Sequence, residues 1–149
     1  MEFQTAIFVR KFLSNVLDEL TLEQLNTIPK GYNNNILWNI AHILVTEQML
    51  SYGLSGLPIA INEDFISRFK KGSVCLSNYS NDDIKLIKNK YFNLINKTKD
   101  DYQNNRFSKF NEYPTSTGIV LKNIDEAMRF NSLHEGIHLG VILSLKKLV

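Results

Sequence analysis

Three histidines, all that this 149-residue chain contains, are spaced so that one metal ion could use them together. His134 and His138 are four residues apart, and on a helix this step places two side chains on the same face. His42 lies in a separate, strongly apolar stretch, where burial of the neighbouring side chains would turn its ring toward the same interior. Two imidazoles from one helix and a third from another could ligate a divalent cation.

A lone histidine on an apolar helix face is more often a hydrogen-bonded core residue than a metal ligand. For His42 taken alone, that interpretation holds. Three histidines in one core are different, because every buried imidazole nitrogen needs a partner and there is no surplus of buried acids. We therefore predict that His42, His134 and His138 bind one divalent ion, and that binding weakens below a pH of roughly 6.

The string HEGIH, residues 134–138, also matches the H-E-x-x-H motif of zinc peptidases, in which the glutamate is the general base. Such a peptidase needs another ligand downstream, and the residues after His138 include no Asp, Glu or His. Gly140 does not fit the longer form of the motif either. The sequence therefore argues against a peptidase.

Four long stretches with apolar residues at helical spacing must position these side chains. They cover residues 3–20, 36–52, about 80–102, and 123 to the C-terminus. The sequence places helix caps at Asn35, at Ser80 with Asp83, and at Asn123 with Glu126. A short capped turn is predicted at Thr21 with Gln24, a connector helix over 62–71, and an irregular segment over 104–122.

Four amphipathic helices without a convincing strand predict an all-α fold, an antiparallel four-helix bundle. The connection between the second and third helices, roughly residues 53–79, is long enough to cross over, so a simple up-and-down order is not required. We predict that residues 1–149 form a single helical-bundle domain, because their number suits one ordinary hydrophobic core.

Charge and composition exclude several classes of partner. The 17 basic and 15 acidic residues are interspersed, which leaves no charge patch for nucleic acid or a membrane surface. No stretch approaches the roughly 20 apolar residues that span a bilayer, and the N-terminus lacks a signal-peptide core. Cys75 is alone, so a disulfide framework is excluded. We therefore predict a cytoplasmic protein that acts on a small-molecule substrate.

Two stretches together resemble the DinB-like superfamily of metal-binding four-helix bundles. They are NNILWNIAHI, residues 34–43, and the late pair His134-x-x-x-His138. Their order, one histidine on the second helix and the pair on the fourth, is similar over essentially the whole chain. The resemblance implies a DinB-like bundle with His42, His134 and His138 as ligands. The stretch LGVI, residues 139–142, departs from the more polar turn expected after the pair.

The resemblance also implies a function, because DinB-like relatives include transferases that use a low-molecular-weight thiol such as bacillithiol or mycothiol. Three imidazoles leave a cation with open positions, as in catalytic sites. We expect zinc or nickel, with iron and manganese left open. The ion would lower the pKa of a bound thiol, and Glu135 or a water would accept the proton. A homodimer is expected from the resemblance and from the nearly all-round apolar second helix.

Two other functions remain open on the sequence alone. With water in place of the thiol, the protein would be a metal-dependent hydrolase. It could instead be a stress-related metal-binding or interaction module without turnover. A pocket open to solvent at the metal favours an enzyme, whereas a sealed ligand cluster favours a structural role. Four residues within a turn of a ligand are candidates for orienting the imidazoles: Asn39, Thr46, Asn131 and Glu135.

Overall fold

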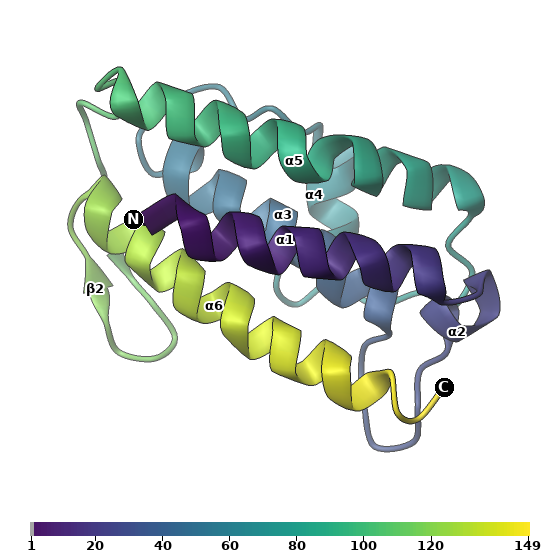
Figure 1. Ribbon diagram of the computed structural model, residues 1–149. Coiled ribbons are helices and arrows are strands. Elements are labelled where there is room, and N and C mark those ends of the chain that lie inside the picture. Colours follow the sequence, from purple (N-terminus) through teal and green to yellow (C-terminus); the bar gives the residue numbers. More distant parts are fainter. Residues whose placement is uncertain (1) are drawn as a thin grey trace.

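Four long helices packed side by side form the body of the molecule (Figure 1). A computed structural model describes residues 2–149, apart from the side chains of Glu2 and Phe92. The long helices are α1 (Glu2–Glu19), α3 (Ile36–Gln48), α5 (Asn81–Gln103) and α6 (Ile124–Leu145). Helices α1 and α3 each pack against both α5 and α6. The predicted all-α four-helix bundle is confirmed.

Side-chain caps begin three of these helices where the sequence predicts them. The capping oxygen belongs to Asn35 in α3, to Ser80 in α5 and to Asn123 in α6, and each accepts a backbone N–H three residues on. Each cap satisfies one of the N–H groups that a helix start leaves without an internal partner. The short helix α2 (Leu22–Asn26) likewise begins at the predicted capping box of Thr21 and Gln24.

The connection between α3 and α5 runs back along α3 and carries the short helix α4 (Glu63–Phe69). Near its start, the backbone N–H of Ala60 donates to the side chain of Gln48, at the end of α3. Near its end, the side chain of Asn35, at the start of α3, donates to the carbonyl of Leu76. The predicted crossover is therefore confirmed. As a result α3 and α5 run in the same direction, as do α1 and α6, so not every neighbouring pair is antiparallel (Figure 1).

A small hairpin precedes α6, in the segment that the sequence predicts to be irregular. Its strands β1 (Tyr113–Pro114) and β2 (Val120–Leu121) pair antiparallel, with Tyr113 opposite Leu121. The turn between them needs Gly118, whose φ of +86° lies in the region that favours glycine. The prediction of no strand here is wrong because strands of two residues are too short to show an alternating pattern.

Helix α3 is buried on nearly all sides within the chain itself. A turn of π-helix, η1 (Met49–Gly53), continues it, so the two together cover the predicted range 36–52. Because α4, α5 and α6 cover α3, its apolar composition does not require a second copy of the chain. The predicted homodimer loses this part of its support. Within residues 2–149, every helix is too short or too polar to cross a membrane.

Candidate metal centre

The structure brings His42 on α3 together with His134 and His138 on α6. One ring nitrogen from each lies within 4.8 Å of the others, a group that could hold a metal ion. The rings of His134 and His138 are closest, with 4.4 Å between centroids and 3.2 Å between their Nε2 atoms. The packing of α3 against α6 therefore unites residues that are almost a hundred positions apart in the chain.

Hydrogen bonds orient two of the three imidazoles. The Nδ1 atom of His42 is 2.6 Å from the carbonyl oxygen of Phe69, and Nδ1 of His138 is 2.8 Å from Oδ1 of Asn39. Since carbonyl and amide oxygens only accept, both Nδ1 atoms carry the proton and both Nε2 atoms present a lone pair. Asn39 is itself held, because its Nδ2 donates to the carbonyl of Asn35.

The donor set fits a divalent cation. In a tetrahedral site with bonds of about 2.0–2.1 Å to nitrogen, two ligand nitrogens lie about 3.4 Å apart, close to the 3.2 Å between His134 and His138. Two neutral Nε2 atoms at this distance repel through their lone pairs unless a proton or a cation lies between them. The buried Nδ1 of His134 has no hydrogen-bond partner among the described residues, so the tautomer of this ring depends on whether its Nε2 donates to His138 or binds a cation.

Burial keeps all three imidazoles neutral near physiological pH. It lowers the pKa of His134 to about 3 and that of His138 to about 4, and the neighbouring imidazoles add to the effect. Burial also lowers the pKa of His42, against the opposing effect of the Phe69 carbonyl. Only a neutral imidazole has a free lone pair for a metal, so the site is ready for a cation without first losing protons.

We expect zinc affinity to change little between pH 7 and 6 and to fall at lower pH, as the imidazoles gain protons. Protons compete with the metal only below the pKa of the free site, and the pKa values of His134 and His138 are lowered to about 3 and about 4. The structure therefore predicts that the loss of zinc affinity begins below the pH of about 6 expected for free imidazole. Competition with a chromophoric chelator at each pH measures the affinity, with circular dichroism as the control for folding. A steady loss between pH 7 and 6 would contradict this expectation.

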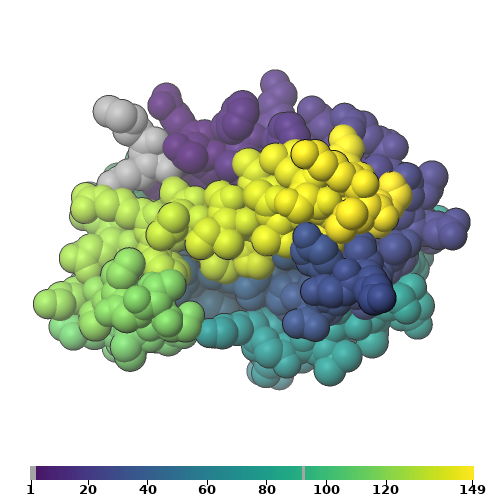
Figure 2. Space-filling view, turned by 90° about the horizontal axis from the view of Figure 1, so that it is seen from below, coloured from purple at the N-terminus to yellow at the C-terminus, as the bar shows by residue number. Residues whose placement is uncertain are grey.

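A cavity of about 550 Å³ opens beside the three histidines, and all three line it. Part of its wall comes from two connections: the turn after α4, at residues 70–72, and the hairpin segment, at Tyr113, Thr115 and Ser116. Figure 2 shows the green hairpin segment and the teal crossover on the same face, below α6. Apolar side chains, among them Trp38, Val45 and Phe130, cover much of the interior. Trp38 also stacks on the ring of His42, at 4.7 Å and 11°.

Glu135 does not line this cavity, although it follows a candidate ligand directly. Its carboxylate is fully buried and accepts hydrogen bonds from Arg10 at 2.9 Å and from Asn131 at 2.8 Å. Burial alone lowers the pKa of Arg10, but the charges of Glu135 and Glu47 outweigh it, and the pKa is raised. Glu135 therefore ties α6 to α1 in the core, a place that does not suit a proton acceptor for a ligand in the cavity.

The four candidates for orienting the imidazoles divide into two pairs. Asn39 bonds to His138, and the hydroxyl of Thr46 lies 3.3 Å from Nε2 of His42. Asn131 and Glu135 bond to each other instead.

Sequence reasoning also missed residues that belong to the site. The predicted connector helix ends at Phe69, whose carbonyl orients His42, and is followed by two lysines that line the cavity. No sequence pattern marks a backbone carbonyl as a partner. Two adjacent lysines after a short helix look like any solvated helix end.

The fold and the site define a class: small helical bundles with a three-histidine group between two helices and a cavity beside it. The family model described as the DinB superfamily matches residues 7–142. The chain belongs to the DinB superfamily, as its sequence motifs indicated. A comparison with curated proteins finds no match.

Proposed function

We propose that the protein is a metal-dependent enzyme that transfers a low-molecular-weight thiol to an electrophilic small molecule. The observation that carries this proposal is the cavity of about 550 Å³, because all three histidines line it. A volume of this size suits a small ligand. A metal held there has room for an exchangeable ligand, whereas a structural site is closed by four protein ligands. Zinc or nickel suits three imidazoles best.

The lining of the cavity favours a thiol over water as the attacking group. Among its described lining residues there is no Asp or Glu, and Glu135 is held by Arg10 outside it. A metal can activate water by itself, but ester and amide hydrolysis usually also needs an acid–base residue that passes the proton to the leaving group. A cation of this kind supplies a thiolate by lowering the pKa of a bound thiol, without a protein base. The cavity therefore lacks a residue that a hydrolase would need and that a thiol transferase would not need.

The residues of the site divide the remaining work. His42, His134 and His138 hold the cation, and Asn39 and the carbonyl of Phe69 keep two of the rings in the binding orientation. The apolar wall around Trp38 and Phe130 receives the electrophile and limits access of water. In the transfer, the sulfur forms a bond to the electrophilic carbon and the leaving group departs with the bonding electrons. The proton of the thiol passes to water.

We expect the zinc-loaded protein to accelerate conjugation of a model electrophile, such as 1-chloro-2,4-dinitrobenzene, with at least one small thiol. The rate should depend on the metal, because the free thiol is mostly protonated at neutral pH. Absorbance of the conjugate measures turnover, and His134→Ala, which removes one ligand, is the inactive comparison.

Two other results would reject the transferase. Cleavage of ester or amide substrates without any thiol-dependent turnover would support the hydrolase. A metal that added ligands cannot reach, together with no turnover of either kind, would support the binding module.

A further inference from the structure

The cavity beside the metal centre has a positively charged end. Lys70 and Lys71 both line it and both are exposed. Among the side chains that the structure describes, no carboxylate lies within 4.0 Å of either ammonium group. Other lysines do have such a partner: Lys85, Lys88, Lys97 and Lys146. With no acid in the described lining, the cavity carries two uncompensated positive charges before any metal binds.

The turn that carries these lysines is fixed to the metal centre. It follows α4, whose last residue, Phe69, offers its carbonyl to His42. Two residues after Lys71, the hydroxyl of Ser73 accepts a hydrogen bond from the indole of Trp38 at 3.0 Å. A backbone bond from Ser73 to the carbonyl of Lys70 closes the turn. Both ends of the turn are thus held by α3, and the two lysines stay beside the histidines.

Lys70, Lys71 and the three histidines line one cavity, so an anion bound at the lysines would share this space with whatever the histidines hold.

We propose that Lys70 and Lys71 form a subsite for a carboxylate of the ligand that occupies this cavity. The proposal rests on the proposed function, since it names the substrate class of the same site: a thiol or an electrophile that bears a carboxylate. Two ammonium groups without acidic neighbours favour an anion by simple charge attraction. Phosphoryl groups more often use arginines or a helix N-terminus, and no arginine is among the described lining residues.

Cobalt-substituted protein allows the test, because a thiolate bound to cobalt absorbs in the near ultraviolet. Mercaptosuccinate, with two carboxylates, is titrated against thioglycerol, which has none. We expect the protein to bind mercaptosuccinate about tenfold more tightly, the size that two ion pairs with exposed lysines can supply. In Lys70→Gln/Lys71→Gln this preference should disappear while thioglycerol binds as before.

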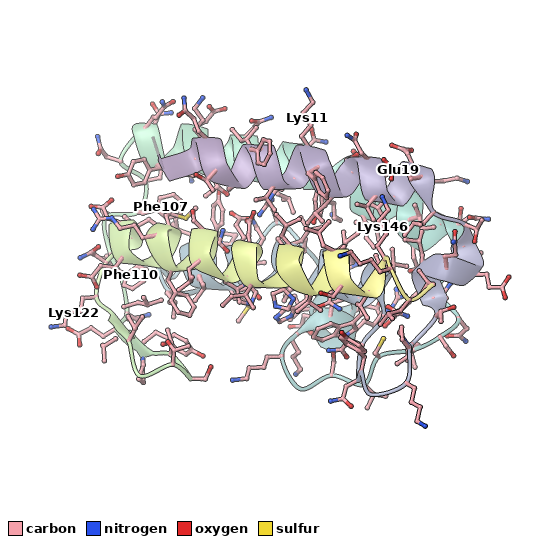
Figure 3. The ribbon with its side chains drawn as sticks, turned by 60° about the horizontal axis from the view of Figure 1, so that its bottom comes forward. Lys11, Glu19, Phe107, Phe110, Lys122 and Lys146 are labelled. Carbon is pink, nitrogen blue, oxygen red and sulfur yellow. The ribbon has the colours of Figure 1, made fainter. Side chains whose placement is uncertain are left out.

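A matched control removes the same charge elsewhere. The variant Lys11→Gln/Lys147→Gln changes two lysines that do not line the cavity, and Lys11 points away from the bundle (Figure 3). It should keep the preference for mercaptosuccinate. Equal binding of both thiols to the unaltered protein, or a preference that survives in the Lys70→Gln/Lys71→Gln variant, overturns the subsite but leaves thiol binding intact.

Succinate provides an arm that does not depend on thiol chemistry. Trp38 is the only tryptophan of the chain and lines the cavity, so its fluorescence reports binding there. We expect succinate to change this fluorescence in the zinc-loaded protein and not in Lys70→Gln/Lys71→Gln. If no thiol binds to the cobalt, the proposed function fails. The subsite is then tested by succinate alone, and a protein that does not bind succinate overturns the subsite. If succinate and thioglycerol bind at the same time, the carboxylate belongs to the electrophile. If succinate competes with mercaptosuccinate but not with thioglycerol, the carboxylate belongs to the thiol.

Discussion

Replacing His138 by alanine is expected to reduce the affinity for zinc by about a thousandfold while the bundle stays folded. The substitution removes one of three nitrogen ligands, together with the ring that faces His134 at 3.2 Å. The apolar core does not depend on this side chain, which is only partly buried. Titration against a chelator of known affinity measures the loss, and circular dichroism measures the helical content.

Ile137→Ala is the matched control for this experiment. Ile137 precedes His138 on α6, is 54% exposed, and does not line the cavity. Its truncation should leave zinc affinity unchanged. A His138→Ala protein that still binds one zinc ion with the original affinity would show that the three histidines are not the ligands. Loss of helical structure on chelation of the unaltered protein would show that the ion is needed for folding.

The second large effect is expected at Arg10, which is buried in the core and does not line the cavity. Its guanidinium is fully buried and lies 2.9 Å from Glu135 and 3.8 Å from Glu47. Arg10→Met leaves two carboxylates buried without a positive partner, and breaking a buried ion pair in this way costs about 3–5 kcal/mol. We expect this loss in the free energy of unfolding, measured by urea denaturation.

Lys11→Met changes the same charge one residue along α1, at an exposed position, and should cost less than about 0.5 kcal/mol. A loss below about 1 kcal/mol in Arg10→Met would show that the buried pair contributes little. Glu135→Gln extends the test. As a residue that ties helices together, Glu135 should affect stability, with turnover per folded molecule retained. Loss of turnover in fully folded, metal-loaded Glu135→Gln would return Glu135 to the role of proton acceptor.

The helices and their caps were predictable because their signals are local. A cap such as Asn35 needs only its own side chain and the N–H three residues away, and apolar spacing alone marks a core-facing helix. The hairpin at Tyr113 was not predictable, since two residues cannot show a period. The register of α1 did carry one unused signal: Arg10 is in step with the buried residues Ala6, Leu13 and Leu17, so its burial was open to inference.

The three histidines were predictable as a group because each lies on a helix face whose direction follows from its apolar neighbours. The hydrogen-bond partners of the histidines were harder to predict. Asn39 is one turn before His42 on α3, but it bonds to His138 across the interface, and only the packing of α3 on α6 decides this. Glu135, which a short motif suggests as a proton acceptor, accepts hydrogen bonds from Arg10 and Asn131 in the core. Motif spacing places it next to His134 along the chain, yet a step of one residue turns it to another face of the helix.

The site is built from two kinds of segment, the long helices that carry the histidines and the connections beside them, and the two can change independently. The three histidines belong to long helices whose other residues build the core, so changes in the length or path of these helices would affect folding as well as the histidine cluster. Part of the cavity wall belongs to connections, at residues 70–72 and at Tyr113, Thr115 and Ser116, and connections tolerate changes in length and sequence far better. Related chains could therefore exchange these two segments and acquire new ligands on an unchanged metal-binding frame. For protein engineering, they are the positions to diversify in a library.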